Sequence, residues 1–292
     1  KYDNKPLEMI KTAGLSITLN PFGRKLNEYE TINLISDADF LIAGTESLSR
    51  QVLQSANKLQ IISRCGVGLD NIDLQVAKDM NIKVFNTPNG PTNAVAELTV
   101  ALILSLLRKV PLMDSHLKKN IWLKKMGNLL YKKKIGIIGF GRIGQKVAKL
   151  LLPFDTVISY YDINKISHSL NCKPLDLKFL LAWADIITIH SSGSLAKAAV
   201  IGHRELQLMK PSSWLINVSR GGIVDENALY NALIKREIEG AAIDVYDNEP
   251  YKGLLIECEN IVLTPHVGSY ARESRVEMEV QAVENLLNEI KI

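Results

Sequence analysis

Ile135-Gly136-Ile137-Ile138-Gly139-Phe140-Gly141-Arg142-Ile143-Gly144 is the stretch that decides the fold of this 292-residue chain. An apolar run enters the pattern G-x-G-x-x-G, and the helical sequence Gln145–Leu150 follows. In this context Gly139 permits a tight turn, Gly141 lets backbone approach a pyrophosphate, and Gly144 lets the helix pack on the strand. The free N–H groups at the helix start would bind the phosphates. The stretch therefore predicts a dinucleotide-binding βαβ unit.

An acidic residue stands where such a unit needs one. The apolar run Thr156–Tyr161 ends at Asp162, and 162 − 139 places this carboxylate 23 residues after Gly139. A carboxylate there accepts hydrogen bonds from ribose hydroxyls and repels a 2′-phosphate. No Arg follows it within several residues. The sequence therefore predicts NAD rather than NADP as the cofactor.

Short apolar runs rich in Ile and Val alternate with stretches of helical periodicity along the chain. Their near-continuous hydrophobicity is typical of strands buried on both faces of a parallel sheet. The alternation predicts a doubly wound α/β fold. The predicted strands are Leu15–Leu19, Phe40–Ala43, Gln60–Ser63, Lys83–Asn86, Ile135–Gly139, Thr156–Tyr161, Ile186–His190, Trp214–Val218, Ala241–Val245 and Ile261–Thr264. The predicted helices include Gln51–Ala56, Asp73–Met80, Glu97–Leu107, Gly144–Leu152, Leu175–Ala182 and Glu226–Lys235.

Composition limits the classes of protein to consider. The net charge of +4 gives no support for nucleic acid or an anionic membrane as partner. The longest apolar run, Leu98–Leu107, is too short to span a bilayer, and no signal peptide is visible. Cys65, Cys172 and Cys258 are odd in number and far apart, so we expect neither a disulfide framework nor a metal cluster. A reducing cytoplasm is the expected location.

The segment Arg108–Lys134 differs in composition from the rest of the chain. It holds nine basic residues against one acid, Asp114, and carries Trp122 and Leu129-Leu130-Tyr131. We expect a solvated, irregular arm. Its apolar residues are a weaker indication of a subunit contact.

Three residues with catalytic chemistry follow apolar runs: Arg220, Glu249 and His266. The planar fork of an Arg binds a carboxylate and polarises a neighbouring carbonyl. A His protonates an alkoxide as hydride arrives, and a carboxylate orients that His. Taken alone, each also has an ordinary structural explanation, as a surface cation, a loop acid or a satisfied histidine. Spacing by itself therefore leaves the trio a hypothesis.

The chain resembles the D-isomer-specific 2-hydroxyacid dehydrogenase family, of which D-3-phosphoglycerate dehydrogenases are members. The matching stretches run in family order from about residue 40 to 270. They are Arg64–Asp73, Asn86–Gly90, Val95–Leu98, Gly139–Gly144, Asn217–Glu226, Ala242–Tyr246 with Glu249-Pro250, and Thr264–Gly268.

The resemblance implies hydride transfer between NAD and a small 2-hydroxy or 2-keto acid, with 3-phosphoglycerate as one candidate. It implies that Arg220 binds the substrate carboxylate and carbonyl, and that His266 is the acid/base with Glu249 as its partner. Asp244 would hold the nicotinamide carboxamide. The implied cofactor-binding residues are Gly139, Gly141, Arg142, Ile143, Gly144, Asp162, Ser191, Val218, Ser219, Asp244 and Gly268. The implied substrate-binding residues are Arg64, Val67 and Gly68.

The resemblance also implies a discontinuous architecture of two doubly wound, Rossmann-like domains with parallel sheets and an interdomain cleft. Residues 1–96 plus 267–292 would form the substrate domain, and residues 97–266 the NAD-binding domain. Family members are usually homodimers joined through the nucleotide domain, so we expect a homodimer.

Two departures from the family pattern concern loops. After His190 the family commonly has Pro-Leu-Thr, where this chain reads Ser191-Ser192-Gly193-Ser194. The first substrate loop, Ile42–Glu46, lacks the cation of phosphoglycerate-type relatives. Two alternatives stay open on sequence grounds: a non-catalytic NAD(H)-sensing protein like the corepressors of this superfamily, and an NAD-using hydrolase of the adenosylhomocysteine type.

Overall fold

The structure, a computed structural model, describes residues 3–191 and 199–291. Contacts within the chain define two compact units. Unit 1 combines Lys1–Ala94 with Ser269–Ile292, and unit 2 is Val95–Gly268. The domain limits expected from the sequence, 96/97 and 266/267, lie two residues from these divisions.

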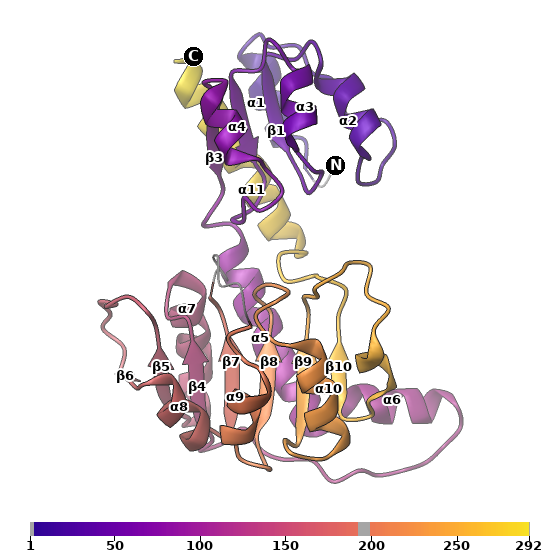
Figure 1. Cartoon of the computed structure of the whole chain (residues 1–292), viewed down its shortest axis with the longest axis vertical. Coiled ribbons are helices and arrows are strands. Elements are labelled where there is room, and N and C mark those ends of the chain that lie inside the picture. Colours follow the sequence, from indigo (N-terminus) through magenta and orange to yellow (C-terminus); the bar gives the residue numbers. More distant parts are fainter. Residues whose placement is uncertain (1–2, 192–198, 292) are drawn as a thin grey trace. The chain divides into compact units, whose positions relative to one another are not determined.

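Unit 2 is built on a parallel sheet of seven strands within the described residues, in the order β10-β9-β8-β7-β4-β5-β6 (Figure 1). The strands are β4 (Lys134–Ile138), β5 (Val157–Tyr161), β6 (Lys173–Pro174), β7 (Ile186–Ile189), β8 (Trp214–Asn217), β9 (Gly240–Ile243) and β10 (Ile261–Leu263). The strand order reverses between β7 and β4. In doubly wound sheets this switch point, at the carboxyl ends of the strands, is where ligands bind.

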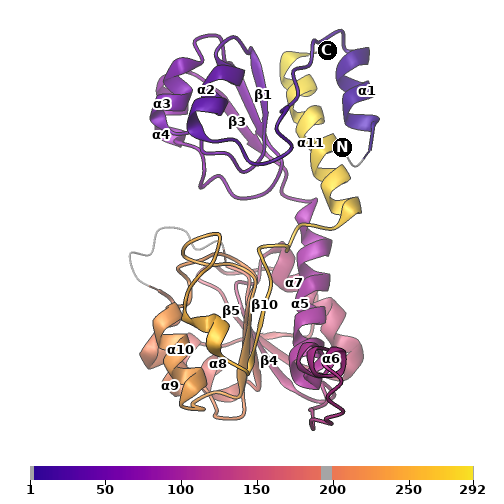
Figure 2. The ribbon, with the colours of Figure 1, turned by 90° about the vertical axis from the view of Figure 1, so that its right-hand side faces the viewer.

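Helices cover both faces of this sheet, which explains why its central strands are mostly apolar. Figure 2 shows α8, α9 and α10 on one face and α5 and α7 on the other. All four residues of β7 and of β8 are buried as a result. The helices are α5 (Pro91–Arg108), α6 (Val110–Lys118), α7 (Arg142–Leu151), α8 (Leu177–Trp183), α9 (His203–Leu208) and α10 (Glu226–Ile234), with short 3₁₀ turns at Leu152–Phe154 and Leu254–Glu257.

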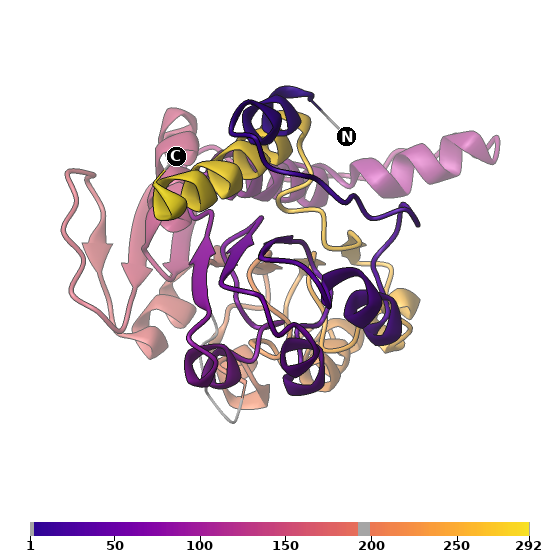
Figure 3. The same ribbon diagram turned by 90° about the horizontal axis from the view of Figure 1, so that it is seen from above.

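Unit 1 has a smaller parallel sheet of three strands in chain order, counted over the described residues: β1 (Phe40–Ala43), β2 (Ile61–Arg64) and β3 (Lys83–Asn86). Figures 2 and 3 show α1 and α11 on one face of this sheet and α2, α3 and α4 on the other. These helices are α1 (Lys5–Thr12), α2 (Glu28–Ile35), α3 (Arg50–Ser55), α4 (Leu74–Asp79) and α11 (Arg272–Ile290). The α/β class and the parallel sheets predicted from the sequence are confirmed.

Two local predictions were wrong. Leu15–Leu19 is not a strand, because no strand of the described chain pairs with it, and Leu19 is 62% exposed. The arm Arg108–Lys134 is not irregular throughout, since its residues Val110–Lys118 form α6. The left-handed Lys109 (φ 53°) separates α5 from α6, and Pro111 in the first turn suits a helix start.

Candidate active site

The sequence-predicted site residues of unit 2 lie at one edge of its sheet. Neighbouring strands of this sheet are parallel, so their carboxyl ends share that edge. The residues that follow these strand ends are Gly139 after β4, Asp162 after β5, Ser191 after β7, Val218 to Arg220 after β8, Asp244 after β9, and His266 to Gly268 after β10.

The glycine-rich turn is tightly packed at two of its glycines. Gly139 has φ 87°, and a Cβ built on it would lie 2.6 Å from the Ser191 nitrogen. A Cβ on Gly144 would lie 2.2 Å from the Gly139 carbonyl oxygen. Gly141 differs, because its Cβ would meet no atom of the described chain within 4 Å. The turn therefore excludes side chains at Gly139 and Gly144 and leaves open space above Gly141.

This open space adjoins the start of α7, for which Gly141 is the N-cap residue. The first N–H groups of an α-helix have no acceptor inside the helix, and the helix dipole makes this end positive. Arg142 is exposed and Ile143 is half-buried in the first turn. Exposed backbone, free amides and a positive helix end fit a pyrophosphate at this position.

Asp162 is bound to the same turn. Its Oδ2 accepts a hydrogen bond from the Phe140 N–H at 2.7 Å, and its Oδ1 accepts one from the Asn164 N–H at 2.8 Å. A carboxylate oxygen has two lone pairs, so each can accept a further hydrogen bond. Asp162 thus fixes the glycine-rich turn and still has the acceptors that a ribose hydroxyl requires.

His190 stands at the switch point next to Ser191. Its N–H donates to the Ile138 carbonyl at 2.7 Å, and its Nε2 lies 2.9 Å from Thr188 Oγ1. Burial lowers the pKa of His190 to about 3, so the imidazole is neutral at physiological pH. Sequence reasoning gave His190 no role. The structure shows that it joins β7 to β4 beside the glycine turn. Ser192 to Ser194, the departure from the family pattern, lie outside the described residues.

His266 and Glu249 meet although they are separated by 17 residues in the chain. The His266 Nδ1 lies 2.9 Å from Glu249 Oε2 and 3.0 Å from Oε1. The two side chains are 48% and 39% exposed, respectively. Glu249 Oε1 also accepts a hydrogen bond from the Tyr246 N–H at 3.2 Å, which fixes the carboxylate. Nδ1 is therefore committed to Glu249, and Nε2 is the ring nitrogen left for exchanging a proton with a ligand.

The loop that carries His266 is held by Asp244. This side chain is fully buried, and its Oδ1 accepts hydrogen bonds from Thr264 Oγ1 at 2.6 Å and the Val267 N–H at 2.9 Å. Its Oδ2 accepts one from the Gly268 N–H at 2.9 Å. Burial raises the pKa of Asp244, and these hydrogen bonds oppose that shift. The sequence did not predict this loop-holding contact.

Asn217 organises the turn that carries Arg220. Its Oδ1 accepts hydrogen bonds from the Ser219 N–H at 3.1 Å and Ser219 Oγ at 2.7 Å. Its Nδ2 donates to the Arg220 carbonyl at 3.1 Å. The guanidinium of Arg220 is half-buried and donates to the Ser219 carbonyl through Nη1 at 2.7 Å. Val218 is buried beside this turn. Asn217 was part of the matching motif, but sequence reasoning gave it no role.

Arg64, Val67 and Gly68 belong to unit 1. Arg64 is the last residue of β2, and Val67 and Gly68 lie in the loop that follows it. The neighbouring Gly66 donates to Thr87 Oγ1 at 2.6 Å, and the Val67 carbonyl accepts from Asn86 Nδ2 at 2.8 Å. Within the described residues, the N–H groups of Val67 and Gly68 have no acceptor. A fixed loop with free amides of this kind can bind an anion.

No group of three His, Cys, Asp or Glu side chains is placed to hold a metal ion in the part of the chain that the structure describes.

Comparison with known proteins agrees with this geometry. Residues 100–268 match the family described as D-isomer specific 2-hydroxyacid dehydrogenase, NAD binding domain. The chain is 34% identical to hydroxypyruvate reductase of Thermotoga maritima, with 99% of this chain and 97% of that protein covered. It is 36% identical to D-3-phosphoglycerate dehydrogenase of Synechocystis, covering 89% of this chain.

The chain spans about half the length of that phosphoglycerate dehydrogenase, 48%. Among solved structures, the TT0316 protein from Thermus thermophilus superposes with a TM-score of 0.92 at 33% identity, over 98% of this chain and 94% of that one. The match covers more than half of the sequence, and the fold agrees over nearly all of it. The chain therefore belongs to the D-isomer specific 2-hydroxyacid dehydrogenase family.

Proposed function

We propose that the protein is an NAD-dependent dehydrogenase that transfers hydride between nicotinamide and a small 2-hydroxy or 2-keto acid. The observation that carries the proposal is the contact of His266 Nδ1 with both oxygens of Glu249, at 2.9 and 3.0 Å. An imidazole oriented in this way is an acid/base group, and it follows a strand of the sheet whose switch point bears the glycine-rich turn.

NAD fits the residues at this sheet edge. The start of α7 and the open space above Gly141 suit the pyrophosphate. Asp162 suits the adenosine ribose and would repel a 2′-phosphate, which favours NAD over NADP. When bound, the nicotinamide supplies or accepts the hydride. The residues assigned to its side of the site are Ser191, Val218, Ser219, Asp244 and Gly268.

In the reduction direction, Arg220 binds the carboxylate of the 2-keto acid and polarises its carbonyl. His266 gives a proton from Nε2 to the carbonyl oxygen as hydride reaches the carbonyl carbon, so that the C=O group becomes CH–OH. Glu249 accepts the Nδ1 hydrogen bond, holds the ring in position and stabilises the imidazolium. In the oxidation direction the same proton returns from the hydroxyl to Nε2.

The identity of the acid is the finer part of the proposal. Family membership favours the D-isomer. Arg64 at the end of β2 and the loop with Val67 and Gly68 are assigned to the substrate carboxylate on the resemblance of the sequence and on the free amides of that loop. The Ile42–Glu46 loop offers no cation, and the Glu46 carboxylate caps the Gly44 N–H at 2.9 Å. This favours an unphosphorylated acid over 3-phosphoglycerate.

The expected assembly is a homodimer through the arm of unit 2, where Trp122 is 80% exposed and Met126 is 88% exposed. Apolar side chains exposed to this degree and close together in the sequence of one arm are typical of a subunit contact. A cytoplasmic location agrees with three cysteines that are free and buried.

A substrate screen tests the proposal. NADH and NADPH are each mixed with a panel of 2-keto acids, and nicotinamide absorbance is followed. We expect turnover with NADH and at least one short 2-keto acid. In Arg220→Gln, kcat/KM should fall by about 100-fold or more, because a charged, bidentate contact is lost. The matched control is Arg204→Gln on α9, an exposed cation with no role assigned in the site, and it should behave as wild type. NADH binding without turnover of any acid would favour the NAD(H)-sensing alternative.

A further inference from the structure

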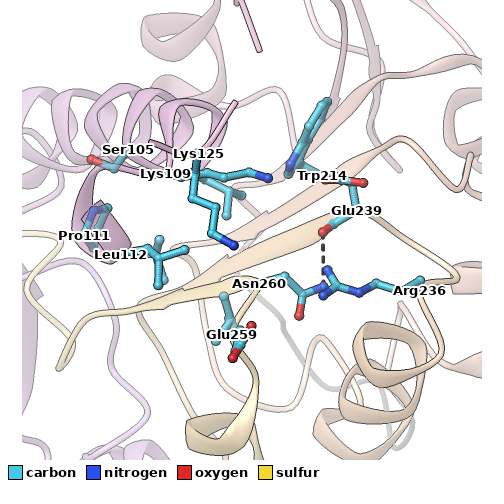
Figure 4. A pocket seen from close by; sticks show the side chains of 13 residues that line it. Ser105, Lys109, Pro111, Leu112, Lys125, Trp214, Arg236, Glu239, Glu259 and Asn260 are labelled. Carbon is cyan, nitrogen blue, oxygen red and sulfur yellow. Dashed lines mark hydrogen bonds between the residues drawn. The ribbon is translucent and has the colours of Figure 1, made fainter. Parts of the chain in front are cut away.

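Unit 2 contains a cavity at the edge of the sheet opposite the strand ends described above. It has a volume of about 140 Å³ and lies at the amino ends of β8, β9 and β10, where α5 gives way to α6. Figure 4 shows the side chains that line it. All of them belong to unit 2, so the cavity is complete within that unit.

Five charged side chains line the cavity: Lys109, Lys125, Arg236, Glu239 and Glu259. No ion pair joins any of them to another residue in the described ranges. In Figure 4 the two lysines enter from the side of α5 and the arm, and Arg236 enters from the opposite side. Three cations and two carboxylates leave a surplus of 3 − 2, or one positive charge.

One wall of the cavity carries a fixed hydrogen-bond acceptor. The Nδ2 of Asn260 donates to the Glu239 carbonyl at 3.1 Å and to the Leu233 carbonyl at 3.4 Å. Both amide hydrogens are directed at backbone oxygens, so the orientation of the amide is set and its Oδ1 remains as acceptor. The other wall is apolar and includes Trp214, which is only 5% exposed.

We propose that this cavity binds a small hydroxycarboxylic acid in its monoanionic form, at a site separate from the catalytic one. A monoanion neutralises the surplus charge. Its carboxylate pairs with the lysines and Arg236, and its hydroxyl donates to Asn260 Oδ1. A cavity of roughly 150 Å³ accommodates benzene, which sets the ligand at about six heavy atoms. The carbon skeleton of such an acid would lie against Trp214.

The size and charge argue against other small ligands. A phosphate dianion would overcompensate the charge and leave the Trp214 wall without an apolar partner. A neutral alcohol would leave the surplus charge in place. A zwitterion such as alanine has the right size but adds no net negative charge. The site therefore selects for charge as well as for shape.

Trp214 supplies a direct readout of binding. The chain has three tryptophans, so the double variant Trp122→Phe, Trp183→Phe keeps Trp214 alone. Lactate, alanine and inorganic phosphate are titrated at constant ionic strength while Trp214 fluorescence is recorded. We expect saturable quenching or enhancement with lactate, and binding of alanine and phosphate at least about fivefold weaker.

Lys125→Gln has a matched control in its neighbour. Both Lys124 and Lys125 are exposed lysines of the arm, but only Lys125 lines the cavity. Lys125→Gln should weaken lactate binding by about fivefold, the effect of one solvent-accessible charge partner, and Lys124→Gln should leave it within about twofold of the parent. Equal effects of the two substitutions would overturn the proposal.

The catalytic site is excluded as the source of the signal by adding Arg220→Gln to the single-tryptophan chain. The Trp214 response to lactate should persist there, and its loss would show that the signal comes from the catalytic site. A Trp214 response that persists in this variant also supports the cavity independently of the proposed function. The turnover screen tests the proposed function separately. Sedimentation supplies the last check. If Lys125→Gln changes the oligomeric state and leaves lactate binding unchanged, the cavity is a subunit contact and the ligand proposal is wrong.

Discussion

Gly141 and Gly144 lie in the same turn, but an added methyl group should affect them differently. At Gly144 it should lower the stability of the fold, and at Gly141 it should weaken cofactor binding. In Gly144→Ala the new Cβ would lie 2.2 Å from the Gly139 carbonyl oxygen and 3.2 Å from Ile137 Cγ2. The first of these contacts is to backbone, so the turn itself must move. In Gly141→Ala the Cβ meets nothing of the described chain within 4 Å, and φ is −71°, which alanine adopts without strain.

The magnitudes follow from these contacts. Overpacking against backbone costs about 3 kcal/mol, and replacing a helical glycine by alanine returns about 1 kcal/mol, so Gly144→Ala should lose about 2 kcal/mol of unfolding free energy. At roughly 2–4 °C per kcal/mol for a chain of this size, Tm falls by about 4–8 °C. Gly141→Ala should be as stable as wild type or more stable by about 0.5 kcal/mol, because alanine restricts the unfolded chain.

Cofactor affinity should fall in Gly141→Ala, the variant whose stability is not lowered. The methyl group of Gly141→Ala would occupy the space assigned to the pyrophosphate, so the Kd for NADH should rise by about tenfold or more, equivalent to about 1.4 kcal/mol. Calorimetric unfolding and titration of NADH fluorescence give the two quantities. Wild-type affinity for NADH in Gly141→Ala would refute the placement of the pyrophosphate. Wild-type stability in Gly144→Ala would refute the packing of the turn.

Three further outcomes are expected. His266→Ala should lower kcat by about 100-fold or more while the Kd for NADH stays within about twofold, since the loss is one of proton transfer; equal losses would argue against the acid/base role. Asp162→Asn should reduce the preference for NADH over NADPH, measured as a ratio of kcat/KM values, and an unchanged ratio would remove Asp162 from the ribose site. Lys210→Met should cost about 1 kcal/mol at pH 7, because the Lys210 Nζ contacts Asp185 Oδ1 at 2.7 Å with both side chains mostly buried. Burial opposes ionisation of Asp185, but its hydrogen bonds to Lys210 and to the Lys134 N–H lower its pKa on balance, so this stabilisation is present above the unfolded pKa near 3.8 and is lost as pH falls through the lowered value. Urea unfolding between pH 3 and 7 checks it. Lys58→Met, which removes the partner of Asp37 in a solvent-exposed pair, is the control, and its trend should be smaller because solvent screens that pair.

The apolar runs, and the small or polar residues that end them, predicted most of the strands. Strands such as Ile186–Ile189 are covered by helices on both faces, so nearly every position is apolar and the run is visible in the sequence. Leu15–Leu19 has the same local character, but a strand also needs a neighbouring backbone to pair with. The sequence does not encode that neighbour locally, and the prediction was wrong there.

The sequence predicted which residue types form the candidate site better than it predicted which of them contact each other. The glycine-rich turn and Asp162 follow from spacing, because one helix start and one strand end fix them. The His266 and Glu249 pairing needs two loops to converge across 17 residues, and only the family resemblance indicated it. The left-handed backbone at His266 (φ 53°) had no signal in the sequence. The hydrogen bonds around it join residues far apart in the chain, because Asp244 accepts from the N–H groups of Val267 and Gly268.

At three strand ends, an Asp or Asn side chain accepts hydrogen bonds from the backbone of a neighbouring turn. Asp162 binds the Phe140 N–H, Asn217 binds the Ser219 N–H, and Asp244 binds the Val267 and Gly268 N–H groups. In each case a short polar side chain at the end of a strand accepts hydrogen bonds from the backbone of a turn that carries proposed site groups. Short Asp and Asn side chains lose little conformational entropy when fixed, and a buried backbone N–H without an acceptor is costly. These side chains therefore set the shape of the turns before any ligand arrives, and the groups proposed to contact ligand, the α7 amides, Arg220 and His266, are held in position by residues that have already satisfied the backbone.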